Sequence, residues 1–522
     1  MAQRRASGQQ ILLPESAQRT SGRDAQTMNI TAGKAIAQGV RTTLGPKGMD
    51  KMLLDSSGHV VVTNDGVTIL SEMDIEHPAA NMIVEVAETL EQEVGDGTTS
   101  AVVLTGELLK QAEELIEQDI HPTTVANGYR RATLHAQDVL ADRAIDVDTD
   151  DVDTLEQVAV TVMTGKSAED AGEHLAELVV RAVRAVDTED GINIDDINVR
   201  PVVGRPVEES EVIDGIPIDT DPVHGEMPTD VSDVSIALLE PGIEIEEPEI
   251  DAEIAVDDPT QLREFQDAER ESLQERADAV ADAGVDVLIA GGDIANAAGE
   301  RLANRGVLAV EGVDADDLAR LARVTGGIRI TTVDDLDSAN LGQAGRVHLG
   351  QIGDDVELFV EGAAETDVVT ILLRGSTEGA VDEIERAIDD SLHAVRVAIE
   401  SGAVLAGGGA PETELALALR DFAEGVGGRE QLAIERFAQA VEVIPRTLAE
   451  NAGLDPIDSL VELRARHDDG DETAGLDVVS GDVIDMYADG TIEPLAVKQQ
   501  VVGSATEAAT MILRIDDVIS AD

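Results

Sequence analysis

Two short glycine-containing loops near the start of the chain carry residue types that suit phosphate binding. They are Leu44-Gly45-Pro46-Lys47-Gly48 and Gly95-Asp96-Gly97-Thr98-Thr99-Ser100. Glycine lets the backbone approach a ligand closely. The second loop opens into a segment with apolar residues at helical spacing, at positions 103, 104, 108, 112, 115 and 116, so the free N–H groups and the dipole of a helix would favour an anion there. Two ordinary turns are the alternative interpretation.

Charged residues near these loops add to the case for phosphate chemistry. Asp96 supplies a carboxylate that could hold a hard cation such as Mg²⁺ against phosphate oxygens. Lysine is scarce, and Lys34, Lys47, Lys51, Lys110, Lys166 and Lys498 are the only ones. Because Lys47 and Lys51 flank the first loop, they hint at a positive charge near phosphate, with chance as the alternative.

The composition limits the class of protein. The 522 residues include 107 Asp and Glu against 37 Lys and Arg, a formal charge of −70. In dilute buffer so many negative side chains repel one another strongly, but molar salt shortens the Debye length to about 3 Å and screens this repulsion. We therefore infer adaptation to a salt-rich cytosol. A disordered acidic chain is the alternative, but 43% hydrophobic residues in long periodic segments argue against it.

Several kinds of site and partner are disfavoured. The chain has no cysteine, so thiolate nucleophiles, disulfides and cysteine zinc sites are excluded, and its nine histidines form no metal-binding pair at helical spacing. No basic stripe is present for nucleic acid. No run of apolar residues is long enough for a membrane span, so we expect a cytoplasmic protein with no membrane or nucleic-acid partner.

The order of segments predicts a multidomain α and α/β protein. Residues 28–143 are mostly helical in pattern, with an alternating stretch at 60–70 that predicts a hairpin around a turn at 56–58. An Asp-rich connector (144–155), a helical stretch and a strand-rich segment (201–248) follow. The later segments predict, in order, a charged helix at 261–283, a buried strand at 285–292, a strand at 368–373, a helix at 379–400 and long helices after 407. Helical ends around an α/β middle predict an inserted domain.

The Gly291-Gly292 pair lacks a dinucleotide fingerprint and is interpreted as a turn.

The ordered set of motifs resembles the chaperonins. The matching segments are the first loop extended to residue 53, Thr63-Asn64-Asp65-Gly66-Val67-Thr68-Ile69, the second loop, Gly407-Gly408-Gly409, and Met511-Ile512-Leu513-Arg514-Ile515-Asp516-Asp517. Within the family the chain is most similar to group II, the archaeal thermosome and its eukaryotic cytosolic relatives. Together with the acidic composition, the resemblance indicates a subunit from a halophilic archaeon.

The resemblance implies a fold and an assembly. It implies an equatorial domain from residues 1–145 and 402–522, an intermediate domain from 146–216 and 368–401, and an α/β apical domain at 217–367 with a helical protrusion near 255–272. It also implies stacked double rings of identical or paralogous subunits that enclose unfolded client proteins. ATP binding and hydrolysis would open and close a built-in lid, with Mg²⁺ as cofactor and K⁺ as a second candidate cation.

The resemblance also implies roles for single residues. Leu44, Gly45 and Pro46 would line the nucleotide, Asp96 would bind magnesium, and Gly97, Thr98, Thr99 and Ser100 would cradle phosphate. Gly408 and Gly409 would lie beside the nucleoside, with Glu493 near the ribose or base. Asp65 and Asp390 would orient and deprotonate the attacking water, and Lys166 would sense the γ-phosphate. Positioning and charge compensation are what phosphoryl transfer mainly requires.

Two other functions stay open at this point. A small-molecule phosphotransferase would explain the phosphate loops but not the middle domain. A ring subunit that binds ATP without turnover would explain the assembly, but Asp65, Asp96 and Asp390 are all present.

The protrusion keeps Leu262 and Phe265 but is otherwise strongly polar.

Overall fold

The chain folds into two compact units. The computed structural model describes residues 18–54, 60–166, 171–188, 191–244, 259–352, 355–363 and 368–520. Unit 1 comprises Met1–Val180 and Asp382–Asp522, and unit 2 comprises Arg181–Val381. The chain leaves unit 1 within helix α7 (Gly172–Ala185) and returns to it within α11 (Glu378–Ser401). The first and last parts of the chain therefore share one unit, while the expected division into five segments stays a prediction.

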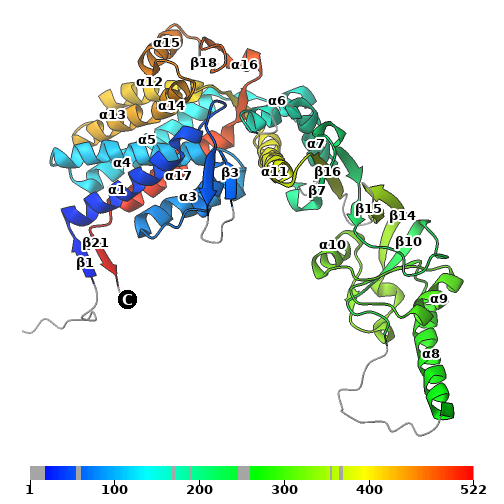
Figure 1. Cartoon of the computed structure of the whole chain (residues 1–522). Coiled ribbons are helices and arrows are strands. Elements are labelled where there is room, and N and C mark those ends of the chain that lie inside the picture. Colours follow the sequence, from blue (N-terminus) through cyan, green and yellow to red (C-terminus); the bar gives the residue numbers. More distant parts are fainter. Residues whose placement is uncertain are drawn as a thin grey trace, which may run out of the picture. The chain divides into compact units, whose positions relative to one another are not determined.

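Unit 1 is mainly helical. Figure 1 shows α1, α4, α5, α13 and α17 packed side by side. The helices are α1 (Arg23–Val40), α2 (Gly66–Ser71), α3 (Pro78–Val94), α4 (Thr98–Glu117), α5 (Pro122–Arg143), α6 (Val152–Met163), α12 (Ala410–Glu424), α13 (Arg429–Val441), α14 (Val443–Asn451), α15 (Pro456–Asp468), α16 (Met486–Asp489) and α17 (Leu495–Leu513), with a 3₁₀ turn at Arg41–Thr43.

The core of unit 1 is built from aliphatic side chains, because the sequence offers few aromatic ones. Residues 103, 104, 108, 112 and 115 of α4 are all buried, as their helical spacing predicts. Tyr129 and Phe437 meet edge to face in this core, with ring centroids 5.5 Å apart. The Tyr129 hydroxyl donates a hydrogen bond to the Leu108 carbonyl at 2.8 Å, which satisfies its buried polar atom.

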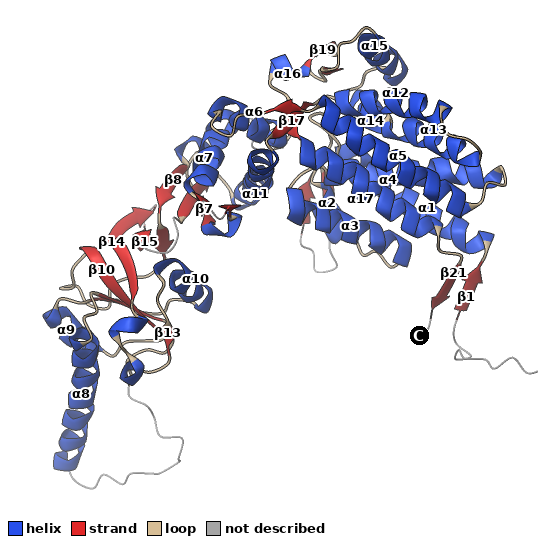
Figure 2. Cartoon of the chain, turned by 180° about the vertical axis from the view of Figure 1, so that it is seen from behind, coloured by secondary structure: helices blue, strands red, loops and turns tan. Residues whose placement is uncertain are grey.

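Short strands join distant parts of unit 1. β1 (Gln18–Ser21) pairs antiparallel with β21 (Asp517–Ser520), so the two described ends of the chain lie side by side (Figures 1 and 2). The remaining strands are β2 (Lys51–Leu54) paired with β3 (Val60–Thr63), β17 (Ala403–Ala406) between β20 (Ile492–Pro494) and β4 (Ile145–Asp146), and β18 (Ala474–Leu476) paired with β19 (Val483–Asp485).

Unit 2 is an α/β unit around a seven-stranded sheet. The sheet order is β12-β11-β10-β14-β15-β9, with β13 also on β10, and β7-β16-β8 and β5-β6 form separate sheets. The strands are β5 (Asp187–Thr188), β6 (Gly191–Ile192), β7 (Ile197–Val203), β8 (Glu211–Asp214), β9 (Ile216–Ile218), β10 (Asp230–Leu239), β11 (Val287–Ala290), β12 (Leu308–Val310), β13 (Arg329–Ile330), β14 (Gly342–Ile352), β15 (Asp355–Ala363) and β16 (Val369–Gly375). The helices are α8 (Pro259–Asp282), α9 (Asn296–Arg305) and α10 (Ala315–Thr325).

The buried strands of unit 2 follow from their sequence. β10, β11 and β12 are parallel, and α8 and α9 lie along the chain between them, which is the βαβ connection that parallel strands need. β11 is buried at every position, as the apolar run at 285–292 predicts. The charged helix predicted at 261–283 is α8, and the helix predicted at 379–400 is α11.

Two sequence expectations were wrong in part. The alternating stretch at 60–70 is a strand only to Thr63, because Asp65 caps a new helix, α2, with its carboxylate. The connector at 144–155 contains strand β4 and the first turn of α6, which Asp151 caps in the same way. The predicted turn at 56–58 and the start of the predicted protrusion, up to residue 258, lie outside the described residues. No helix in the described ranges is both long and apolar enough to cross a membrane.

Candidate functional site

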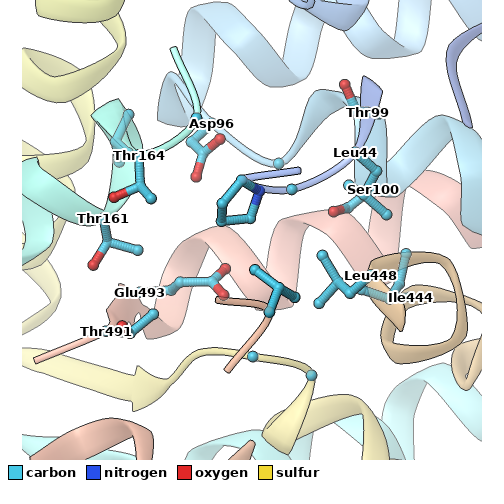
Figure 3. A pocket seen from close by; sticks show the side chains of 18 of the residues that line it. Leu44, Asp96, Thr99, Ser100, Thr161, Thr164, Ile444, Leu448, Thr491 and Glu493 are labelled. Carbon is cyan, nitrogen blue, oxygen red and sulfur yellow. The ribbon is translucent and has the colours of Figure 1, made fainter. Parts of the chain in front are cut away.

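The residues to which the family resemblance assigned roles line one cavity of unit 1. Its volume is about 380 Å³, within the range of about 300–1,000 Å³ that small-molecule sites occupy. Those residues are Leu44, Gly45, Pro46, Asp65, Asp96, Gly97, Thr98, Thr99, Ser100, Lys166, Asp390, Gly408, Gly409 and Glu493. Figure 3 shows the side chains of Asp96 and Glu493 reaching toward the same space, with Ile444 and Leu448 on its other side.

The first glycine loop is held in place by α14. The Asn451 side-chain amide donates to the carbonyls of Arg41 and Leu44, at 3.2 and 2.9 Å. Gly45 has a φ of +78°, and a Cβ there would lie 2.2 Å from the Leu448 side chain, so only glycine fits this turn. The turn leaves Lys47 exposed. Neither Lys47 nor Lys51 lines the cavity, but the charge of Lys47 helps to lower the pKa of Asp477, which does line it. The hint that these lysines place charge near phosphate stays a prediction.

The second loop presents the N-terminus of α4 to the cavity. Gly97 is the N-cap, with a φ of +84° and no side-chain cap, and a Cβ on it would lie 2.5 Å from Val501. The N–H groups of Thr98, Thr99 and Ser100 therefore have no partner within the helix. Asp96 stands beside them, and its carboxylate forms no hydrogen bond or ion pair with another described residue. Backbone N–H groups and a free carboxylate are suited to an anion and its metal ion.

Asp65, Lys166 and Asp390 meet at one end of the cavity. Asp65 caps α2 by accepting the Thr68 N–H at 2.7 Å. The Asn64 amide donates to the Gly165 carbonyl at 2.7 Å, which holds the segment that carries Lys166. Lys166 forms an ion pair with Asp390 of α11. Asp390 is only 9% exposed, although it lies off the main apolar stripe of its helix.

Burial and charge shift the pKa values at this end. Burial raises the pKa of Asp390 to about 7; Lys166 opposes the rise, and Asp65 and Asp96 add to it. Burial raises the pKa of Glu91, a further lining residue from α3, to about 8, with Asp65 and Asp390 as the next causes. Burial alone would lower the pKa of Lys166, but the surrounding carboxylates raise it above its ordinary value. The lysine is therefore charged, while its partner Asp390 titrates near neutral pH.

A second buried lysine lies at the Glu493 side of the cavity. Lys498 of α17 forms ion pairs with Glu412 and Glu493, both at 2.8 Å. Burial raises the pKa of Glu493, and Glu412 adds to the rise while Lys498 opposes it. Nearby, Gly409 is the N-cap of α12. The Ala410 N–H donates to the Gly407 carbonyl at 3.2 Å and Pro411 has no N–H, so this helix end offers less to an anion than the N-terminus of α4.

Part of the cavity lining was not predicted from the sequence. An apolar wall comprises Ile444, Leu448, Leu476, Val478, Val479 and Met486, contributed by short elements that no sequence motif marks. Lys498 and Glu412 were also missed, although a signal existed. Each shares a helical face with apolar residues three, four and seven positions later, which is where a charged residue is expected to be buried and paired.

The arrangement suits a nucleoside phosphate bound with a metal ion. The N-terminus of α4 and the glycine loops could hold phosphate, and the apolar wall offers a surface for a flat base. Among the described residues no group of three or more Asp, Glu, His or Cys could hold a metal ion. A metal at Asp96 would therefore complete its shell with phosphate and water, which is the usual Mg²⁺ arrangement.

Comparison with known proteins identifies the family. The model of the TCP-1/cpn60 chaperonin family matches residues 36–522. The chain belongs to this chaperonin family. This family match supports the chaperonin interpretation of the sequence and not the small-molecule phosphotransferase interpretation. As a chaperonin, the chain is an ATP-dependent chaperone that hydrolyses ATP.

The relatives of this chaperonin are thermosome subunits. Thermosome subunit alpha of Halobacterium salinarum is 60% identical over 521 residues, covering 100% of this chain and 93% of the relative. Thermosome subunit 1 of Haloferax volcanii is 57% identical over 522 residues, with the same two coverages of 100% and 93%. The Thermosome subunit of Methanopyrus kandleri is 55% identical over 526 residues, covering 100% and 96%. The group II resemblance and the inferred halophilic origin are confirmed.

Proposed function

We propose that the cavity of unit 1 binds and hydrolyses ATP with Mg²⁺, and that this reaction drives the chaperone cycle. The observation that carries the proposal is the uncapped N-terminus of α4 beside Asp96, in one cavity with the pair Lys166 and Asp390. Mg²⁺ bound at Asp96 would compensate phosphate charge. K⁺ is a second candidate cation.

Each side chain then has one task. The N–H groups of residues 98–100 bind phosphate, and the loops at 44–46 and 408–409 flank the nucleoside. Asp390, together with Asp65, orients a water molecule and accepts its proton. The water oxygen bonds to the γ-phosphorus as the bond from this phosphorus to the bridging oxygen breaks, and ADP leaves with that oxygen. Lys166 faces the γ-phosphate as its sensor, and Glu493 lies near the ribose or base. Because the Asp390 carboxylate is buried and its pKa is near 7, it is a suitable proton acceptor at neutral pH.

We also propose the assembly and the cycle that the family resemblance implies. Identical or paralogous subunits would form stacked double rings in the cytoplasm and enclose unfolded client proteins. The names "subunit alpha" and "subunit 1" of two relatives support assembly from more than one kind of subunit. Residues 1–145 and 402–522 would be the equatorial domain, 146–216 and 368–401 the intermediate domain, and 217–367 the apical domain.

Separate variants test the two tasks of the carboxylates. Asp390→Ala should keep ATP binding but lower kcat by about 10²–10⁴-fold, because the water loses its base while the phosphate loops are intact. Asp96→Ala should instead weaken Mg²⁺-dependent ATP binding. Turnover and equilibrium binding of ATP are measured in molar KCl. Asp389→Ala, an exposed neighbour on the same helix, is the control and should keep the parent rate; parental turnover in Asp390→Ala would contradict the assignment.

A further inference from the structure

Lys498 links two carboxylates that lie at different depths. Its Nζ is 2.8 Å from Glu412 Oε1 and 2.8 Å from Glu493 Oε2. The side chains of Lys498, Glu412 and Glu493 are 7%, 6% and 19% exposed. Two carboxylates share one ammonium group, so this buried trio carries an excess negative charge.

Only one of the two carboxylates faces the cavity. Glu493 and Lys498 line it, whereas Glu412, on α12, does not. Glu412 Oε2 is buried and has no hydrogen-bond partner among the described residues, so Lys498 is the group that compensates its burial. Breaking a buried pair by removing one partner is costly, which means that Glu412 fixes Lys498 and Lys498 in turn fixes Glu493.

The backbone under Glu493 is fixed as well. Residue 493 lies in β20, opposite Leu405 in the antiparallel pair with β17. The preceding Thr491 carbonyl accepts the Gly407 N–H at 2.8 Å. With its backbone in a sheet and its carboxylate on a buried lysine, Glu493 is a preorganised hydrogen-bond acceptor at the cavity wall.

Glu493 lines the same cavity as Asp96, and the two side chains reach toward the same space (Figure 3). The negative charge of Asp96 reaches Glu493 and adds to the rise of its pKa, so Glu493 lies within electrostatic range of the phosphate end. In a nucleotide the ribose follows the phosphates directly. Ribose hydroxyl groups are donors, and an ionised carboxylate is an acceptor.

We propose that Lys498 and Glu412 are positioning residues that hold Glu493 as the acceptor for a ribose hydroxyl and thereby make the site select ribonucleotides over deoxynucleotides. This inference rests on the proposed function of the cavity. A site built to bond a hydroxyl discriminates strongly against an analogue that lacks it, because the buried acceptor is then left unpaired.

The test is the ratio of nucleotide affinities in the full-length protein. Binding of ADP, 2′-deoxy-ADP and 3′-deoxy-ADP is measured by titration calorimetry in molar KCl with Mg²⁺. The parent should bind ADP about tenfold or more tightly than at least one deoxy analogue, since a bond to a charged group contributes about 1.5–3 kcal/mol. In Lys498→Met that ratio should fall to about twofold or less, mainly through weaker ADP binding.

A second variant guards against simple destabilisation. Lys498→Met leaves two buried carboxylates without a cation, so the double variant Lys498→Met/Glu412→Gln, with one charge removed, is measured beside it. Glu412→Leu should also lower the ratio, although Glu412 does not line the cavity. Lys110→Met, which changes an exposed lysine on α4, is the matched control and should keep the parental ratio.

The outcomes separate this inference from the proposed function. A parental ratio in both Lys498→Met and the double variant would overturn the positioning role, and so would equal weakening of all three nucleotides, which is what a purely structural role predicts. A parent that binds ADP and both deoxy analogues alike would overturn the selectivity. A parent that binds none of the three would overturn the proposed function, and this inference with it.

Discussion

At the scale of single residues, the buried ion pair between Lys166 and Asp390 is the most informative feature of the cavity. It places an acid with a pKa of about 7 next to a permanently charged cation. A lysine that loses an anionic partner when the γ-phosphate leaves interacts differently with the two states. Such a difference is what a ligand-driven switch requires.

The first prediction at this scale concerns pH. In its proposed role as proton acceptor, Asp390 acts in the ionised form, which is present above its pKa. ATP hydrolysis should therefore rise with pH through about 7 and fall about tenfold per pH unit well below it. In Lys166→Met the rise should move to higher pH, because the cation that lowers the Asp390 pKa is lost. Steady-state rates from about pH 6 to pH 9 in molar KCl, with Lys110→Met as control, check this. A flat profile in the parent would contradict it.

A second prediction concerns coupling. Lys166→Ala should bind ATP but protect unit 2 poorly from protease when ATP is added, because the residue that we propose distinguishes ATP from ADP is gone. Limited proteolysis with and without ATP, followed by mass spectrometry of the fragments, measures this. Protection equal to that of the parent would count against the role, and Lys110→Ala should behave like the parent.

Asp390 also shows what sequence can and cannot predict about a site. The stripe of Ile384, Ile388 and Leu392 leaves Asp390 on another face, and the motif resemblance alone selected it. In the structure, Ala387, Ser391 and Ala394 on this second face are buried too. Because these three side chains are small, the second face showed no hydrophobic pattern in the sequence. Lys498 was missed for a different reason. Its helical face indicated burial, but a single sequence does not show which carboxylates a buried lysine contacts.

At the scale of elements, local signals predicted most helices and buried strands but not their ends. The stretch at 60–70 reads as one alternating strand, yet the cap at Asp65 divides it into β3 and α2. A cap is a hydrogen bond of one side chain, and a hydrophobic period does not register it. That division is also what brings Asp65 to the cavity.

Helix α8 leads to a prediction about the protrusion. Leu273, Ala277 and Val280 in its second half are buried in unit 2, whereas Phe265 in its first half is 49% exposed. Deleting residues 258–270 should therefore leave ATP hydrolysis and ring assembly largely intact and abolish the ATP-dependent sequestration of unfolded protein. Protease protection of a labelled unfolded client measures sequestration.

The competing interpretation of α8 is a surface helix packed permanently on unit 2. It predicts that the deletion variant still shields its client from protease when ATP is added. The packed second half, with the Asp278 and Arg301 ion pair at 2.9 Å, is retained in the deletion and keeps its contact with α9. Loss of client protection can then be assigned to the exposed half.

At the scale of the whole molecule, the charge of −70 predicts salt-dependent assembly. Every subunit brings the same excess of carboxylates to its neighbours, and only molar salt shortens the Debye length to about 3 Å. Rings should dissociate as KCl falls below the molar range, as measured by size-exclusion chromatography with light scattering. NaCl at equal ionic strength should preserve them if screening is the cause, and an unchanged profile down to low salt would refute the prediction.

The pairing of β1 with β21 has a consequence for how the protein is made. Residues 18–21 are translated long before their partners at 517–520. Unit 2 is one continuous segment and can fold while translation proceeds, as domains generally do. The cavity, which both Gly45 and Lys498 line, is complete only after both segments have been translated. A chain that stops before residue 498 therefore lacks part of the lining of this cavity, and we expect such an unfinished product not to hydrolyse ATP.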